Sequence, residues 1–217
     1  MAIDWNQFLS LLKKLFLYKS STTKVPIKNT SWEEIIWAAL AFLYDEKNIE
    51  WDPQSHDKSA DIIARLDDED IRISAKAGKI KNERINISSY RLTTFTSLNS
   101  MLYFISRQHS LFNYYLICAR EEMTDGMKYS VYRVSSARLA PRWFLSHRNW
   151  ERTQKFYRLK KGLNFEAKIV FKMSNQLWYT IPKNYFISAE IVLSDLFIPY
   201  NEMGRGMIRF LKDNIRE

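Results

Sequence analysis

Residues 60–76 read ADIIARLDDEDIRISAK, two apolar runs on either side of four consecutive acidic residues. The second run alternates apolar and polar side chains with a period of two, which is the spacing of a β-strand. Two such runs joined by a short, highly charged segment predict a β-hairpin with its turn at residues 67–70. Folding this hairpin would bring Asp61 level with Ser74 and Lys76 at one end of a sheet.

The polar end of this hairpin has two interpretations. A carboxylate and an ammonium group held together at a sheet edge can bind a divalent metal ion and activate a water molecule. An ordinary surface hairpin with a solvated lysine would show the same residues. The rest of the chain has to distinguish between them.

A single domain over residues 1–217 is the expectation from length and composition. The chain is 46% hydrophobic and 15% aromatic, which is enough for a substantial core, and it contains only five glycine and five proline residues. Its formal net charge is +9 and its isoelectric point is near 9.5. A compact basic protein rich in aromatic residues most often binds a polyanion, usually nucleic acid. Charge that serves solubility alone is the alternative.

The only cysteine, Cys118, lies in an apolar run and has no partner for an internal disulfide bond. One cysteine and three scattered histidines cannot assemble a zinc cluster either, and this usage suits a reducing cytoplasm. The N-terminus carries Asp4 where a signal peptide needs positive charge, and no apolar run reaches the ~18 residues of a membrane-spanning helix. We therefore expect a cytoplasmic protein that does not enter membranes.

Residues 31–46 predict a helix with two adjacent glutamates that face different ways. Ser31 and Glu34 have the spacing of a capping box. On a helical wheel Glu33 borders the apolar stripe, whereas Glu34 points nearly away from it. Glu34 would therefore serve the cap, and Glu33 would be able to point at a neighbouring site.

The other elements are predicted from periodicity and turn residues. A first helix, capped by Asp4, precedes a linker at residues 20–29, and Gly78 marks a turn after the hairpin. Asp125 and Gly126 mark a second hairpin. The expected helices cover residues 4–19, 90–109 and 201–217, and the expected strands cover residues 48–51, 113–120, 127–135, 166–172 and 176–181.

Basic residues gather in two stretches. The first follows Lys76 directly, and the second, at residues 138–161, has eight Lys or Arg residues, interleaved aromatic residues and one acid, Glu151. Arginine can bind guanine through two hydrogen bonds, and aromatic side chains can wedge between bases. The alternative is that these aromatic residues belong to the core and the charges are solvated. The candidates for DNA contacts are Lys79, Lys81, Arg84, Arg91, Arg138, Arg142, Arg148 and Arg152.

The order of elements expected over residues 30–120 resembles the core of the PD-(D/E)xK nucleases, which include most type II restriction endonucleases. In that family an acid at the start of a strand is followed, after a hairpin, by an acid, any residue and a lysine. Asp61 and the triplet at residues 74–76 are similar to this pattern. The resemblance implies an α/β fold with a restriction-endonuclease-like core, in which helices flank a mixed central sheet. Residues 121–217 would form an elaboration for DNA recognition and dimerisation.

Two positions depart from the family pattern. Ala60 replaces the family's proline, which touches no chemistry. Ser74 replaces the usual acid, and a hydroxyl group is a poorer ligand for Mg²⁺ than a carboxylate. Some restriction enzymes with serine at this position recruit a glutamate from a neighbouring helix. Glu33 fits that role, and Glu83 is the weaker candidate.

The resemblance implies Mg²⁺-dependent hydrolysis of phosphodiester bonds. Mg²⁺ would be held by Asp61, Glu33 and the backbone carbonyl of Ala75, and it would stabilise the charge that develops on the phosphate. Lys76 would orient the attacking water or help it to lose a proton. Ser74 would bind the ion through a water molecule or hold Lys76 in place.

A type II restriction endonuclease that cuts a short palindromic site in double-stranded DNA is the first functional hypothesis. The family implies a homodimer, because a palindromic site calls for two-fold symmetry, and a functional pairing with a DNA methyltransferase. Two alternatives stay open. One is a structure-selective nuclease of the junction-resolvase type, and the other is a non-catalytic DNA-binding protein whose site has decayed, with Ser74 as its trace.

Overall fold

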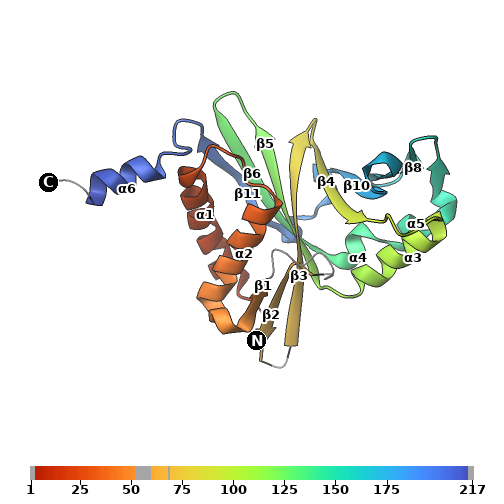
Figure 1. The fold of residues 1–217 in the computed structure, drawn as a ribbon, viewed down its shortest axis with the longest axis horizontal. Coiled ribbons are helices and arrows are strands. Elements are labelled where there is room, and N and C mark those ends of the chain that lie inside the picture. Colours follow the sequence, from red (N-terminus) through yellow and green to blue (C-terminus); the bar gives the residue numbers. More distant parts are fainter. Residues whose placement is uncertain (1–2, 52–59, 68, 215–217) are drawn as a thin grey trace.

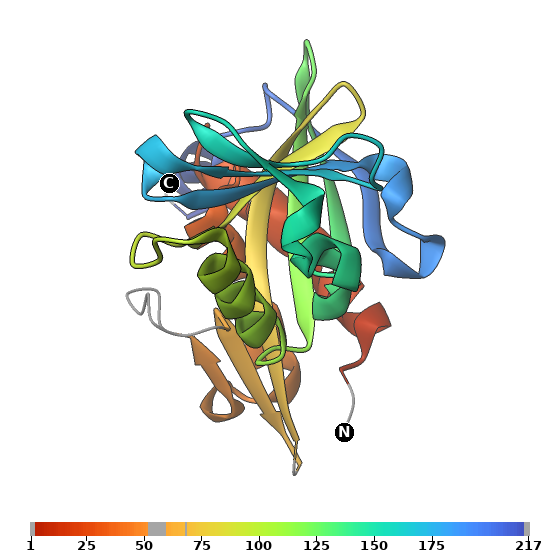
Figure 2. The ribbon, with the colours of Figure 1, turned by 90° about the vertical axis from the view of Figure 1, so that its right-hand side faces the viewer.

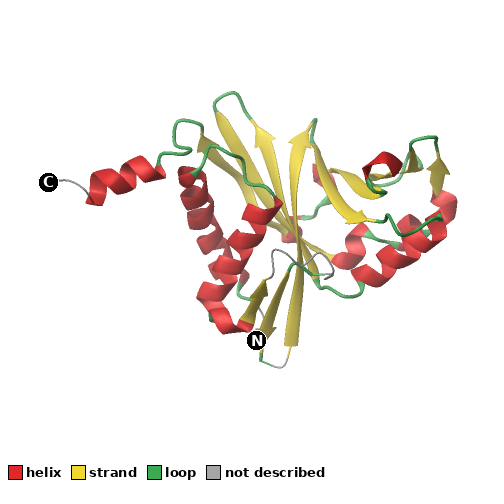
Figure 3. Ribbon diagram, viewed as in Figure 1, coloured by secondary structure: helices red, strands yellow, loops and turns green. Residues whose placement is uncertain are grey.

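The computed structural model describes residues 3–51, 60–67 and 69–214. These residues form an eleven-stranded mixed sheet with helices on both faces (Figure 1, Figure 3). The expected α/β architecture, a mixed central sheet flanked by helices, is confirmed. None of the described helices is long and apolar enough to cross a membrane.

The helices and strands have the following bounds. The α-helices are α1 (Trp5–Thr22), α2 (Asn29–Tyr44), α3 (Leu98–His109), α4 (Ser136–Leu139), α5 (Arg142–Leu145) and α6 (Gly206–Asn214). The strands are β1 (Ile49–Trp51), β2 (Ile62–Leu66), β3 (Glu69–Lys81), β4 (Arg84–Arg91), β5 (Tyr114–Glu122), β6 (Gly126–Ser135), β7 (Trp150–Arg152), β8 (Phe156–Leu159), β9 (Glu166–Val170), β10 (Gln176–Pro182) and β11 (Ile191–Pro199). Short 3-10 helices are η1 (Glu46–Asn48), η2 (His147–Asn149), η3 (Phe171–Met173), η4 (Lys183–Tyr185) and η5 (Ser188–Glu190).

Strand β3 organises the sheet because it is long enough to pair with three neighbours. The main strand order is β11-β6-β5-β3-β4-β10-β9-β8-β7, and β1 and β2 join through the pairing of β2 with β3. Along one side β3 runs parallel to β5, whereas its pairings with β2 and β4 are antiparallel. The pairing with β2 ends at Ile73 and the pairing with β4 begins at Gly78. Among the described residues, 74–77 therefore have a strand neighbour only on the β5 side.

Two hydrophobic cores lie on opposite faces of this sheet. Helices α1 and α2 cover one face, and α3 with α4 and α5 covers the other (Figure 1, Figure 2). Helix α1 begins where Asp4 accepts hydrogen bonds from the backbone N–H groups of Asn6 and Gln7. Its buried side chains follow at helical spacing, and the cap predicted at Asp4 is confirmed.

The second half of the chain extends the same sheet at both edges. Strands β6 and β11 continue it beyond β5, and β10, β9, β8 and β7 continue it beyond β4. Phe144 and Trp150 are buried and pack edge to face with ring centroids 5.2 Å apart. These two aromatic residues of the basic segment at residues 138–161 therefore belong to the core. Strand β11 has no counterpart among the predicted elements.

Both predicted hairpins form, and the register of the first agrees with expectation. Ile62 pairs with Ile73, and Leu66 pairs with Glu69. The turn is shorter than predicted, because Glu69 and Asp70 already belong to β3. Strands β5 and β6 form the second hairpin.

The start of α2 differs from prediction. The helix begins at Asn29, and its N-cap is Lys28, which makes no side-chain capping bond. The predicted capping box of Ser31 and Glu34 is therefore wrong. Glu34 instead forms an ion pair with Lys19 of α1. The Glu34 carboxylate, which the local pattern assigned to the helix cap, therefore contacts the neighbouring helix instead.

The turn predicted at Gly78 is also wrong, because β3 continues through this glycine. The turn comes at Asn82 and Glu83, which both have positive φ, and β4 then occupies residues that were expected to be loop and the beginning of a helix. Helix α3 accordingly starts at residue 98 instead of residue 90. Gly78 is needed for close approach, since an added Cβ would lie 2.4 Å from Cγ2 of Ile87 in β4.

We expect Gly78→Ala to lower the free energy of unfolding by about 1–3 kcal/mol, the range for overpacking a well-filled position. Urea denaturation would measure the loss. Lys81→Ala, at an exposed position of the same strand, serves as the control and should change stability by less than ~0.5 kcal/mol. Equal stability of Gly78→Ala and wild type would show that β4 can move away from β3 at no cost.

Candidate active site

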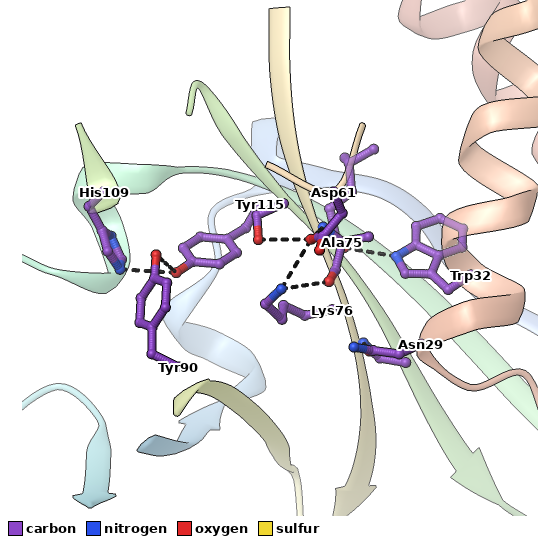
Figure 4. Close-up of polar contacts among 11 residues, drawn as sticks. Asn29, Trp32, Asp61, Ala75, Lys76, Tyr90, His109 and Tyr115 are labelled. Carbon is purple, nitrogen blue, oxygen red and sulfur yellow. Dashed lines mark hydrogen bonds and ion pairs between the residues drawn. The ribbon is translucent and has the colours of Figure 1, made fainter. Parts of the chain in front are cut away.

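A gap in one edge of β3 forms the centre of the candidate site (Figure 4). In the stretch between β2 and β4, side chains take the place of a neighbouring strand. Asp61 Oδ2 accepts the backbone N–H of Ala75 at 2.7 Å, and Asn29 Oδ1 accepts that of Ala77 at 2.6 Å. The N–H of Asp61 itself donates to the carbonyl of Ile73 at 2.9 Å, which holds Asp61 against the end of the hairpin.

The Asp61 carboxylate is oriented by three donors on one oxygen. Besides Ala75 N–H, the Ser74 hydroxyl and the Lys76 ammonium each donate to Oδ2 at 3.1 Å. The Asp61 side chain is 28% exposed and that of Lys76 is 13% exposed, so this ion pair is partly shielded from water. Ser74 is buried. Its hydroxyl group serves here to orient Asp61.

The Lys76 ammonium shows that two oxygens converge on one cation. Its Nζ donates to the carbonyl oxygen of Ala75 at 2.9 Å as well as to Asp61 Oδ2. A carboxylate and a backbone carbonyl are hard oxygen donors of the type that Mg²⁺ prefers. The oxygen donors at the gap are therefore of the chemical type that binds a divalent metal ion. Within the described ranges, three or more His, Cys, Asp or Glu side chains do not gather as a metal site.

Glu33 lies in α2, the helix whose first residue, Asn29, contacts β3. It follows Asn29 by four residues, so the two share one face of the helix, about 6 Å apart along its axis. Trp32 Nε1 donates to the carbonyl of Leu116, which pairs with Ala75, so this turn of α2 is level with Ala75. The carboxylate of Glu34 points instead to Lys19 on α1.

Glu83 lies beyond the C-terminal end of β3, away from the gap. It occupies the turn between β3 and β4, and the part of β3 from Lys76 to Lys81 alone spans about 17 Å. Its carboxylate forms an ion pair with Lys183 at 3.4 Å. The structure therefore does not bring Glu83 to Asp61. The segment just before Asp61, with His56, Asp57 and Lys58, lies outside the described residues.

An aromatic cluster that was not predicted from the sequence lies near the gap, on the side of α3. Tyr115 of β5 is level with Ser74, and its hydroxyl lies 3.0 Å from Nε2 of His109 on α3. Nδ1 of His109 lies 2.8 Å from the carbonyl of Ser136, which can only accept, so Nδ1 carries the proton and Tyr115 donates to Nε2. The Tyr90 ring packs against the histidine ring with centroids 5.7 Å apart. His109 was expected only to end a helix.

Burial sets the charge state of this histidine. It lowers the pKa of His109 from 6.5 to about 4, against the opposing effect of the bond to Ser136, and the nearby Lys76 charge lowers it further. Burial also raises the pKa of Tyr90 and of Tyr115 above their usual range. The cluster is therefore neutral near pH 7. Its uncharged side chains lie near the ion pair of Asp61 and Lys76.

Three of the basic residues predicted to contact DNA form ion pairs within the fold. Lys79 pairs with Glu122, Arg84 with Glu166, and Arg138 with Glu190. Arg138 also donates to the carbonyl of Tyr185 and stacks over its ring at 4.6 Å, which ties α4 to the chain before β11. The other five candidates have exposed side chains: Lys81, Arg91, Arg142, Arg148 and Arg152.

Comparisons with known proteins add one distant likeness. No protein-family model matches the chain, and no curated protein matches it. A solved structure described as a restriction endonuclease in complex with substrate DNA is similar over 82% of this chain and 85% of its own, with a TM-score of 0.39 and 16% sequence identity. This likeness is too distant to assign a function.

We expect stability to fall as the pH is lowered from about 6.5 to about 4 because of His109. In this window the unfolded chain takes up a proton that the folded chain excludes, so protonation favours unfolding. The pKa difference corresponds to about 3 kcal/mol at most. Urea denaturation across this range should show a shallower pH dependence for His109→Gln than for wild type.

His147→Gln is the matched control for this experiment, because His147 is exposed on η2. Comparison with it shows how much of the change in His109→Gln comes from the buried position and how much from the loss of any histidine. An equal pH slope in wild type and His109→Gln would contradict the neutral, buried state assigned to His109.

Proposed function

We propose that this protein is a Mg²⁺-dependent endonuclease that hydrolyses phosphodiester bonds of double-stranded DNA. The observation that carries the proposal is the gap in the edge of β3, where Asp61, Lys76 and the carbonyl of Ala75 meet. A carboxylate, a carbonyl oxygen and an ammonium group at one opening suit a phosphate ester and its counter-cation. The net charge of +9 supports a polyanionic substrate.

Three oxygen donors of the chain would hold the metal ion. They are the carboxylate of Asp61, the carbonyl of Ala75 and the carboxylate of Glu33 from the facing turn of α2. When bound, the ion would supply positive charge against the phosphate and make a neighbouring water more acidic. Ser74 supports this arrangement by keeping Asp61 in its present orientation.

Lys76 has a role that follows from its remaining donor. An ammonium group has three N–H donors, and among the described residues Nζ contacts two acceptors, Asp61 and Ala75. The third donor is therefore available to a phosphate oxygen or to the attacking water. The positive charge of Lys76 also favours negative charge as it develops on the phosphate. In hydrolysis the attacking water loses a proton and the leaving oxygen gains one. An ammonium group cannot accept a proton, so the proton of the water would pass to a phosphate oxygen or to bulk water, which also protonates the leaving oxygen, while Lys76 orients the attacking water.

The finer assignment rests on the family resemblance. It is a type II restriction endonuclease that cuts a short palindromic site as a homodimer and is paired with a DNA methyltransferase. Two-fold symmetry of the protein would match two-fold symmetry of the site. The exposed arginines Arg142, Arg148 and Arg152 support DNA contacts from the second half of the chain, because arginine binds both phosphate and guanine.

One observation favours the non-catalytic alternative. Ser74 donates to Asp61 and brings no second carboxylate, while Lys76 already neutralises Asp61. A nicking assay on supercoiled plasmid, with and without Mg²⁺, decides between the two. Nicking that depends on Mg²⁺ supports the nuclease. DNA binding without any nicking, over a range of divalent ions, would favour the decayed site.

We expect Lys76→Ala to abolish cleavage while DNA binding is largely retained, because Lys76 is assigned to chemistry and adds one charge to a strongly basic surface. Plasmid cleavage and fluorescence anisotropy with labelled duplex DNA would measure the two properties. Lys47→Ala, which removes an exposed lysine paired with Asp45, is the control for charge and should cleave as wild type does. Cleavage by Lys76→Ala at a rate near that of wild type would refute this active site.

Glu33 and Glu34 make a second, internally controlled test. Glu33→Gln keeps the size of the side chain and removes its charge, so we expect cleavage to fall by about two orders of magnitude or more, with weaker Mg²⁺ binding. Glu34→Gln loses only the partly exposed ion pair with Lys19, which contributes ~1 kcal/mol or less to stability, and it should cleave normally. If Glu34→Gln is the inactive variant, or if both variants are active, Glu33 is not the second carboxylate.

A further inference from the structure

Asn29 is attached to the candidate site, although its sequence neighbourhood did not mark it. It is the first residue of α2. Lys28 is the N-cap of this helix, so Asn29 does not occupy the capping position. Its Oδ1 instead accepts the backbone N–H of Ala77 at 2.6 Å. This contact links α2 to β3, 48 residues apart in the sequence.

The contact with β3 fixes which way the amide faces. A backbone N–H can only donate, so the atom of Asn29 that meets Ala77 must be the oxygen. Nδ2 and its two N–H donors are then directed away from that contact. Asn29 is exposed, so these donors are open to a ligand.

The position along β3 places these donors beside the ammonium of Lys76. In an extended strand the carbonyl of Ala75 and the N–H of Ala77 project from the same edge as neighbouring groups. The first of them binds Nζ of Lys76 and the second binds Oδ1 of Asn29. Figure 4 shows both residues at this stretch of β3. Asn29 and Lys76 therefore contact neighbouring backbone groups on one edge of β3.

We propose that Asn29 is a substrate-binding residue whose Nδ2 donates to a phosphate oxygen of the nucleic-acid backbone next to Lys76. The inference rests on the proposed function for its substrate class. Phosphate oxygens only accept hydrogen bonds, and asparagine is among the side chains that position nucleic-acid backbones without reading their sequence. Asn29 thereby joins the substrate to the helix that carries Glu33.

The test separates the two ends of the amide. Asn29→Asp keeps an acceptor for Ala77 N–H and removes both donors, so the fold should be retained while binding of labelled duplex DNA of mixed sequence weakens about tenfold or more. Thr30→Asp is the matched control, since it adds the same charge at the next exposed position of α2. It should weaken binding by less than about threefold. Binding is measured by fluorescence anisotropy without divalent metal, and folding by urea denaturation.

The possible outcomes distinguish this inference from the proposed nuclease. Equal weakening by Asn29→Asp and Thr30→Asp would reduce the effect to charge and overturn the role of Asn29, as would wild-type binding by Asn29→Asp. The two variants should differ most clearly at ~0.5 M salt. At this concentration the repulsion between the added carboxylate and DNA is screened, whereas the loss of a hydrogen bond is not. Wild-type protein that binds DNA but does not cleave it would overturn the nuclease and leave the Asn29 comparison decisive. Wild-type protein that binds no DNA would overturn both.

Discussion

The site depends on the requirement that backbone polar groups inside a sheet find partners. Strand β3 satisfies this along one side with β5, but the other side is shared by β2 and β4, which leave residues 74–77 uncovered. Side chains of Asp61 and Asn29 meet the open N–H groups, and Lys76 meets the open carbonyl. A polar cluster therefore lies at this point of the sheet, because the fold leaves backbone groups of β3 here without a strand partner among the described residues.

The ion pair at this gap is held in a single arrangement by the groups around it. Removing two opposite charges from water is costly unless further hydrogen bonds compensate, and here Ser74 and the backbone of Ala75 provide them. On the side of α3, the neutral side chains of Tyr115 and His109 lie near this ion pair. Asp61 and Lys76 are thus held in a defined orientation by their neighbours, and the function proposed for them would depend on that orientation.

The basic residues of the chain fall into two groups. Some of them hold the fold together, and Arg138 is the clearest case, since its guanidinium group bridges Glu190 and the carbonyl of Tyr185. Others are exposed, among them Arg142, Arg148 and Arg152 in the segment from α5 to β7. The aromatic residues among them are divided in the same way, because Phe144 and Trp150 fill the core behind α3 and half-buried rings such as Tyr157 lie nearer the surface.

The sequence by itself determined the hairpin and the level of Asp61 with Ser74, because strand periodicity and a charged turn are local properties. It also indicated α1 and the hairpin of β5 and β6 from their cap and turn residues. Local signals failed where tertiary pairing overrode them: Glu34 left its capping role for Lys19, and β3 ran through Gly78 because only glycine admits β4 so closely. The attachment of Asn29 and the cluster around His109 join elements far apart in the chain. Only packing decides such contacts, since the residues that make them carry no signal in their own neighbourhoods.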